Sequence, residues 1–534
     1  MPNSKVAPLA PTSALPPSGV VAFAIASALA LASCSGFLVT PGSGTAGTTG
    51  SAGTGSTGAA GTLGAGTAGT NGAAGNAVGT AGTTLVSGSA GRGGTTGAAG
   101  TGVAGNGSAG NGSAGNGAGN MGGSAAGTMG NTGTAGTLSR GPTAAIAGVN
   151  FPFPQNRPMT GCGYPANYNN LDVMAAYTQW KAETVTSNGA GGALRVQRLA
   201  TDTQGASTPL NSTVSEGIAY GMMVSVYMND KATFDGLWSY EKMHRDPRGL
   251  MDWAIAADGK PVGTGAATDA DEDMAFALMM ADKQWGNYMS DALSQVNAVW
   301  NNDIFDSKLP KNGDTWGDWG NLNISYFAPA YYRLFKQIDT DATHKWDDVI
   351  KTVYDTLAVS LNATNGNLTN GLVPAWCDST GKAVPPGPGG APPFHYQYDS
   401  CRTPFRIGLD WCWFGEARAR DYVAKTSSFF AGIGAANIVD GYDLNGNKHV
   451  QFSPANGTPT VAQQSAAFVG PAAVGAMSNP AQYQTFLNDA YARLITRQML
   501  VGGGYYDQSW GVMSLLMLTG NFLNYRAISP YTGP

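Results

Sequence analysis

The segment ATDADEDMAFALMMADKQW, Ala267 to Trp285, combines the two strongest structural signals in this sequence. Four acids stand within five residues: Asp269, Asp271, Glu272 and Asp273. Behind them, apolar residues recur at positions i, i+3, i+4 and i+7: Met274, Ala277, Leu278 and Ala281. This spacing predicts a helix that buries one face and begins with its acids at the rim of a core.

These acids have two competing interpretations, chemistry and helix capping. Carboxylates in a first turn are favoured by the helix dipole and accept hydrogen bonds from free backbone N–H groups. Carboxylates crowded at a rim can also carry acid–base chemistry. A calcium loop is excluded, because it needs Gly at its sixth position and a bidentate acid at its twelfth, where this chain has Met274 and Met280.

Residues 1–34 have the pattern of a bacterial export signal. Lys5 precedes an apolar run from Val20 to Leu31, and Leu31-Ala32-Ser33-Cys34 resembles a lipobox. We expect cleavage before Cys34 and lipidation of its thiol, so that the mature protein is held on the outer face of a bacterial membrane only by this anchor. The alternative is an ordinary signal peptide and a secreted protein.

Residues 35–140 consist almost entirely of Gly, Ala, Thr, Ser and Asn, with Arg92 as the only charge before Arg140. Such a composition cannot form a core, and we predict a disordered linker. A coil of this length has an r.m.s. reach of roughly 50 to 60 Å. The linker would hold a domain away from the membrane.

Residues 141–534 contain all 12 Trp and all 34 acids, against 26 of the 29 basic residues, so this part carries a net charge of −8. A body of this size has ample residues for a core. Its acidity argues against nucleic acid or anionic lipid as partners. A neutral or cationic partner that stacks on aromatic rings fits better, and carbohydrate meets that description.

The cysteines beyond Cys34 leave the disulfide state open. Cys162, Cys377, Cys401 and Cys412 are an even number in an exported chain, so disulfides are permitted, but a core this large does not require them. With no CxxC pair and only four His, the sequence indicates no metal site, and we expect no cofactor.

Helical apolar stripes recur from Phe151 onward, separated by short breaks marked by Gly or Pro. They predict an all-α domain with about a dozen helices. Four segments between the stripes concentrate aromatic and acidic residues and are predicted as loops at one end of a helical ring, lining a groove: Leu250–Trp253, Trp316–Trp319, Tyr396–Asp399 and Tyr505–Asp507. Rings and carboxylates together are what sugar hydrolysis requires.

Hydrolysis of a glycosidic bond takes two carboxyl groups, and Glu216, Asp269 and Asp399 each stand near a predicted helix start. Five blocks resemble, in order, those of glycoside hydrolase family 8: Ser215–Met222, Gly249–Trp253, Ala267–Trp285, Ser325–Tyr332 and Tyr398–Pro404. The resemblance covers about residues 151–522 and is most specific in the acidic block.

The resemblance implies an (α/α)6 barrel and an inverting mechanism on β-1,4-linked glycans. It implies Glu216 as general acid, Asp399 as general base and Asp269 as the carboxylate that holds the sugar at the cleavage point. It also implies substrate contacts at Tyr326, Tyr398 and Arg402, with Trp253 and Trp316 as stacking platforms. Asp271 and Asp273 then return to the capping interpretation.

One tension concerns the proton of Glu216. A helix N-terminus favours the charged carboxylate, whereas a general acid must be protonated near neutral pH. We expect a nearby Asp269 and desolvation to raise the pKa of Glu216. Arg402, three residues after Asp399, would keep that base ionised if their side chains meet.

Among β-1,4-glycans, the acidic block and Gly249–Trp253 look most like the cellulase and lichenase members, so we expect a monomeric endo-β-1,4-glucanase that acts outside the cell. A xylanase or a chitosanase of the same family remains open. So does a surface lipoprotein that binds glycan without cutting it.

Overall fold

The computed structural model describes residues 141–199, 208–316, 320–385, 395–449, 463–496 and 504–533. The predicted signal segment with Cys34 and the predicted linker, residues 1–140, lie outside these residues. No helix within the described ranges is both long and apolar enough to cross a membrane.

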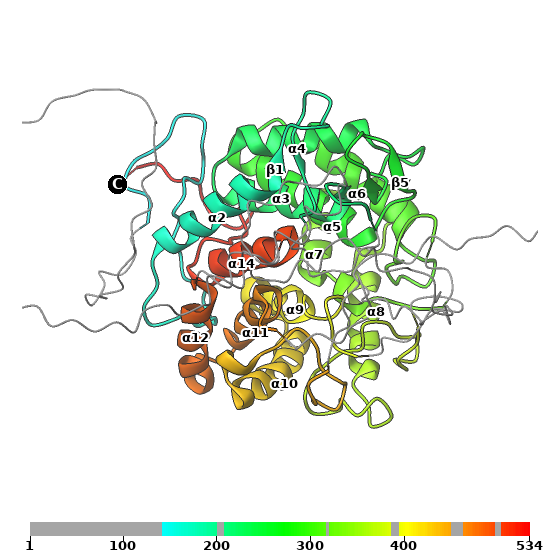
Figure 1. Ribbon diagram of the computed structural model, residues 1–534, viewed down its shortest axis with the longest axis vertical. Helices are drawn as coiled ribbons and strands as arrows, with labels where there is room; N and C mark the ends of the chain where they lie inside the picture. Colours follow the sequence, from blue (N-terminus) through cyan, green and yellow to red (C-terminus); the bar gives the residue numbers. More distant parts are fainter. Residues whose placement is uncertain are drawn as a thin grey trace, which may run out of the picture. The chain divides into compact units, whose positions relative to one another are not determined.

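Six helices form a closed inner ring. They are α3 (Ser215–Tyr227), α5 (Thr268–Trp285), α7 (Pro329–Ile338), α9 (Thr403–Phe414), α11 (Ala466–Ala476) and α14 (Gly504–Leu518). Each of them packs on the next one in chain order, and α14 packs on α3, which closes the ring. Figure 1 shows these six helices at the centre of the described region.

Six further helices surround the ring. They are α2 (Asn170–Thr184), α4 (Lys231–Met243), α6 (Met289–Asp303), α8 (Trp346–Ser360), α10 (Ala417–Ile433) and α12 (Pro480–Leu494). Inner and outer helices alternate along the chain (Figure 1). The outer helices bury one face, whereas every residue of α3, α11 and α14 is buried, as expected for helices packed on all sides. The predicted (α/α)6 barrel is confirmed.

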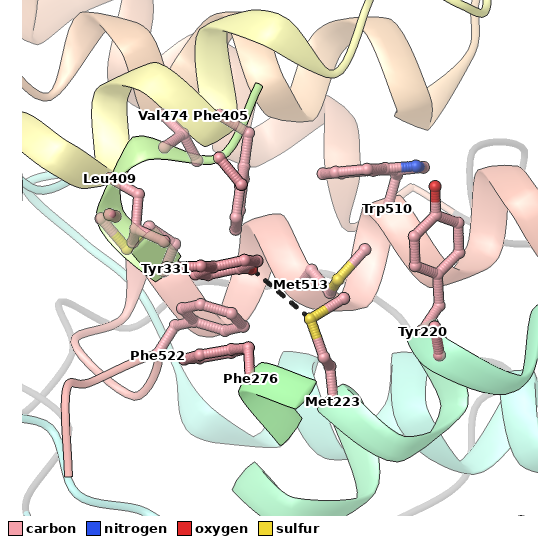
Figure 2. Close-up of a cluster of buried hydrophobic side chains, with 14 of the residues drawn as sticks. Tyr220, Met223, Phe276, Tyr331, Phe405, Leu409, Val474, Trp510, Met513 and Phe522 are labelled. Carbon is pink, nitrogen blue, oxygen red and sulfur yellow. Dashed lines mark hydrogen bonds between the residues drawn. The ribbon is translucent and has the colours of Figure 1, made fainter. Parts of the chain in front are cut away.

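The interior of the ring is filled by large side chains. Figure 2 shows one cluster to which all six inner helices contribute: Tyr220, Met223, Phe276, Tyr331, Phe405, Leu409, Val474, Trp510 and Met513, joined by Phe522. The hydroxyl of Tyr331 lies 3.5 Å from the sulfur of Met223. Because this core is close-packed, it rigidly supports the side chains that lie at the end of the ring.

Short strands fix the entry into α3. β3 (Thr213–Val214), β4 (Ala254–Ile255) and β5 (Pro261–Gly263) form an antiparallel sheet, with Val214 opposite Ala254. A second pair, β1 (Val185–Thr186) and β2 (Arg195–Val196), is also antiparallel. Since β3 runs directly into α3, the sheet positions the first turn of that helix.

A disulfide answers the question that the sequence left open. Cys162 and Cys412 are bonded across 250 residues and join the segment before α2 to α9. Cys377 and Cys401 are free and buried.

The inner helices begin at one end of the ring. Glu216, Asp269 and Tyr505 are each the second residue of their helix, and Arg402 is the N-cap residue of α9. Their side chains contact one another, as described below. First turns that meet in this way require parallel helices, and they bring four distant parts of the sequence to one place.

Candidate active site

Glu216 lies at the start of α3 and is almost fully buried. The backbone N–H before it, on Ser215, donates to the carbonyl oxygen of Trp253 at 2.9 Å. Its carboxyl group accepts two hydrogen bonds, from the hydroxyl of Tyr505 at 2.8 Å and from Nη1 of Arg402 at 2.7 Å. One oxygen is used for each donor.

Asp269 lies beside Glu216 at the start of α5 and is 1% exposed. Its Oδ2 accepts from the same Nη1 of Arg402, at 2.5 Å, and its Oδ1 accepts from the backbone N–H of Ala270 at 3.0 Å. Because one nitrogen of Arg402 donates to both side chains, the carboxyl groups of Asp269 and Glu216 lie close together. The negative charge of Asp269 therefore favours the protonated form of Glu216.

Asp399 lies in the turn before α9 and is fully buried. Two side-chain amides donate to it, Gln397 at 2.9 Å and Asn323 at 3.3 Å. Nη2 of Arg402 lies 3.7 Å from its Oδ1. The expected meeting of Asp399 and Arg402 therefore occurs, and the amides fix the orientation of the carboxyl group.

Arg402 connects the three carboxyl groups. Besides Glu216, Asp269 and Asp399, its guanidinium donates to the hydroxyl oxygens of Ser325 at 3.0 Å and Tyr220 at 3.2 Å. The ring of Tyr326 lies 5.1 Å from its Cζ, within the range of a cation–π contact. A single buried cation thus touches every acid of the candidate site.

The electrostatic environment favours a protonated Glu216. Burial, reinforced by Asp269, raises the pKa of Glu216 to about 8 against the opposing charge of Arg402. Burial also raises the pKa of Asp399 to about 7, although Arg402, Gln397 and Asn323 all pull it down. Arg402 therefore limits the rise at Asp399 without cancelling it.

This arrangement can supply both groups that glycoside hydrolysis needs. One carboxyl group is protonated near neutral pH, and another is held by amides with its oxygens oriented. The guanidinium of Arg402 lies between the carboxyl groups of Glu216 and Asp399, at 2.7 Å from the first and 3.7 Å from the second. These two distances and the width of the guanidinium set an upper limit on the distance between the two carboxyl groups. That limit is compatible with the separation of about 6.5–9.5 Å that inversion requires.

The three other predicted contact residues lie around this centre. Trp253 is buried with its indole against Gly263, where an added Cβ would come within 2.2 Å of the ring. Trp316 is partly buried and packs on Gly313 in the same way. The hydroxyl of Tyr398 donates to Asp440 at 3.3 Å.

Several contacts of the site are not evident from the sequence. Tyr505, Tyr220, Ser325, Asn323 and Gln397 contact the acids or Arg402. Tyr505 belongs to a segment predicted as a loop, and this prediction is wrong, because Tyr505–Asp507 form the first turn of α14. The segment is nonetheless at the predicted end of the ring.

The capping interpretation of Asp271 and Asp273 is also wrong. Both side chains are buried, at 0% and 1% exposure. Asp273 accepts from Nη2 of Arg406 at 2.8 Å, and burial, reinforced by the negative charge of Asp303, raises the pKa of Asp271 well above its ordinary range. The helix turns these residues toward neighbouring helices, because its whole first half is enclosed. Within the described part of the chain, no three His, Cys, Asp or Glu side chains are placed to hold a metal ion.

Known proteins resemble this chain over most of the described domain. The sequence profile of glycosyl hydrolases family 8 matches residues 160–520. Endoglucanase A of Acetivibrio thermocellus is 35% identical over 72% of this chain and 76% of its own length. Endoglucanase C of Ruminiclostridium cellulolyticum is 37% identical over 67% of this chain and 72% of its own length. The apo structure of a β-1,3-1,4-glucanase from Paenibacillus sp. X4 is 28% identical, superimposes with a TM-score of 0.60, and covers 70% of this chain and 98% of that one.

Proposed function

The chain belongs to glycosyl hydrolase family 8 and is therefore a glycoside hydrolase, and from this membership we propose that it is an inverting, endo-acting hydrolase of β-1,4-glucan. The observation that carries the proposal is the convergence of Glu216, Asp269 and Asp399 on the single guanidinium of Arg402. The family implies a polysaccharide substrate.

In the proposed mechanism, Glu216 gives its proton to the oxygen of the glycosidic bond as that bond breaks. Asp399 takes a proton from the water that attacks the anomeric carbon from the opposite face. The two protonation states are then reset by exchange with solvent. Gln397 and Asn323 keep the base oriented, and the two-donor contact with Tyr505 and Arg402 orients the acid.

Asp269 has a different proposed role. Its carboxylate holds the sugar ring at the cleavage point, and its negative charge keeps the proton on Glu216. Arg402 and Tyr326 line the same subsite, together with Tyr398. Trp253 and Trp316 are proposed to bind sugar units further along the chain of the substrate.

Glucan is preferred as substrate because the relatives at 35% and 37% identity are named endoglucanases, and the structure at 28% identity is named a β-1,3-1,4-glucanase. Reducing-sugar release from carboxymethylcellulose, lichenan, xylan and chitosan, measured in parallel, tests this preference. We expect the fastest release from carboxymethylcellulose or lichenan. Fastest release from xylan or chitosan would show that this glycan, and not glucan, is the preferred substrate. Binding of one glycan with no cleavage of any would contradict the hydrolase proposal.

Stereochemistry and cleavage pattern give further tests. Proton NMR at early times should show the α-anomer as the first product of a β-linked substrate, and the β-anomer would contradict inversion. The viscosity of carboxymethylcellulose should fall well before reducing ends accumulate. A proportional change would contradict endo action.

We also propose that the protein works as a monomer on the cell exterior, anchored through a lipid on Cys34, with residues 35–140 joining the anchor to the catalytic domain. The basis is the lipobox-like Leu31-Ala32-Ser33-Cys34. In a bacterial host, the wild type should take up labelled palmitate and sediment with membranes. The variant Cys34→Ser should do neither, and unlabelled wild type in the medium would contradict the anchor.

A further inference from the structure

Two ion pairs stack one above the other between α5 and α9. The upper pair is Asp269 with Arg402, and the lower pair is Asp273 with Arg406. Both pairs join residues 133 positions apart, so the two parallel helices are in the same register at both levels. Four residues along a helix correspond to about 6 Å, so the lower pair lies about one turn beneath the candidate active site.

The lower pair is fully enclosed. Asp273 is 1% exposed and Arg406 is 2% exposed. Arg406 also faces Glu272, at 3.8 Å, and the ring of Tyr331, 5.9 Å from its Cζ. In such surroundings a charge is screened weakly and acts over several ångströms.

Asp273 is the nearer of the two acids that face the charge of Arg406, at 2.8 Å against 3.8 Å for Glu272. Burial raises the pKa of Glu272 well above its ordinary range, which favours the neutral form of this carboxyl group. Burial raises the pKa of Asp273 only to about 6, because Arg406 opposes the rise. Arginine stays charged throughout this range.

The lower pair acts electrostatically on the candidate site. Asp273 interacts with both Asp269 and Arg402, and it also interacts with Tyr220, whose hydroxyl accepts from Arg402. The charged and titratable groups that face the two levels come from five inner helices: Glu216 and Tyr220 of α3, Asp269 and Glu272 of α5, Tyr331 and Tyr332 of α7, Arg402 at the start of α9, and Tyr505 of α14. Burial keeps the tyrosines Tyr220, Tyr331 and Tyr332 neutral, since the pKa of each is raised well above 10.

We propose that Asp273 is a positioning residue that neutralises the buried charge of Arg406 and so sets the pH range in which the Glu216–Asp269–Arg402 centre holds its proton. The inference rests on the proposed hydrolase function. Without Asp273, Arg406 would add an unbalanced positive charge beneath the centre. A positive charge favours carboxylates, so Glu216 would lose its proton at lower pH.

The test is the pH profile of kcat/KM on lichenan, which reports the free enzyme. In Asp273→Asn combined with Glu272→Gln, which keeps Glu272 from compensating, the alkaline limb should move to lower pH by about one unit. Glu272→Gln alone should move the limb much less, because Glu272 lies farther from Arg406 than Asp273 does and burial favours its neutral form. Adding Arg406→Gln to the double variant removes the unbalanced charge and should return the limb to its wild-type position.

If Asp273 had a purely structural role, the double variant would have a lower kcat but an unshifted alkaline limb, and Arg406→Gln would restore nothing. An unmoved alkaline limb in the double variant, or a shifted limb that Arg406→Gln does not restore, overturns the proposal. If the double variant does not fold, Asp273→Ser with Glu272→Gln makes the same charge change and leaves room for a water beside Arg406. Loss of the hydrolase proposal itself is recognised separately, because the wild type would then release no sugar at any pH.

Discussion

Arg402 joins side chains that lie between 3 and 186 positions away in the sequence. Its three carboxylate partners could be predicted from the sequence, because each stands in a block that resembles the family. The hydroxyl partners of Arg402 and the side chains that donate to Glu216 and Asp399 could not, since Tyr505, for example, meets Glu216 across 289 residues and only when the ring closes. Gly217 makes that approach possible, because an added Cβ there would lie 3.2 Å from the ring of Tyr505.

The pH profile of the free enzyme follows from the two raised pKa values. Asp399 must be ionised to accept a proton, so activity should fall below its pKa of about 7. Glu216 must be protonated, so activity should fall above its pKa of about 8. A plot of kcat/KM against pH should therefore be a bell with its maximum between these values. A maximum below pH 5 would contradict the assignment.

Removing the hydroxyl of Tyr505 should move the alkaline limb of this pH profile. The hydroxyl donates to Glu216 at 2.8 Å and favours the ionised form, which lowers the pKa of Glu216. In Tyr505→Phe the pKa of Glu216 should rise, and the alkaline limb should move to higher pH by up to about one unit. Tyr531→Phe, which removes a hydroxyl that contacts only Pro142 in the described structure, serves as control. A shift to lower pH in Tyr505→Phe would be inconsistent with this role.

At the scale of the elements, the helical spacing of Ala267–Trp285 predicted α5 correctly, whereas the capping role predicted for Asp271 and Asp273 is wrong. Spacing identifies the apolar face of a helix, but α5 is enclosed on nearly all sides, so its acidic face is buried as well. Asp271 and Asp273 then need partners on other helices, and no local pattern reveals those partners. The first turn of α14 was missed because its aromatic and acidic residues look like a surface loop.

The pair formed by Asp271 of α5 and Asp303 of α6 should make stability depend on pH. Both side chains are fully buried. Burial is the main cause that raises the pKa of each well above its ordinary range, and the negative charges of neighbouring acids raise it further. A carboxyl group with a raised folded-state pKa binds more protons in the folded than in the unfolded state. Its contribution to stability is present at low pH and is lost as the pH rises above about 4, the unfolded value.

Asp303→Asn should reduce that loss, because an amide can donate to Asp271 without a bound proton. The free energy of unfolding of this variant, from urea titrations, should exceed the wild-type value at pH 8 by about 1 kcal/mol, with a smaller gain at pH 5. The exposed Asp306→Asn makes the same charge change and should give no such difference. A variant that is less stable than wild type by the same amount at both pH values would contradict the raised pKa values of this pair.

At the scale of the whole molecule, the closed ring of six inner helices was expected from the family blocks and is confirmed. The alternation of inner and outer helices brings all the first turns of the inner ring to one end, and this is why acids about 50 and 130 residues from Asp269 can share one arginine. The bond between Cys162 and Cys412 could not be predicted, since spacing alone does not select one pairing among four cysteines.

That disulfide should stabilise the domain, because it restricts a loop of 250 residues in the unfolded chain. The variant Cys162→Ser with Cys412→Ser should unfold with a free energy lower by about 2–5 kcal/mol and should keep its activity at 25 °C. A reductant should lower the melting temperature of the wild type toward that of the variant and leave the variant unchanged. Equal melting temperatures in the absence of reductant would show that the bond contributes nothing.

The most direct test of the hydrolase mechanism is the rate of lichenan hydrolysis by Glu216→Gln and Asp399→Asn, measured beside the wild type and the exposed control Asp306→Asn. Both variants keep the shape of the side chain and one of its two acceptor oxygens, but neither amide can exchange a proton. Each should reduce kcat by about 10²–10⁴-fold, while the control remains at the wild-type rate. Near-normal hydrolysis by either variant would contradict the assignment of Glu216 and Asp399 as acid and base.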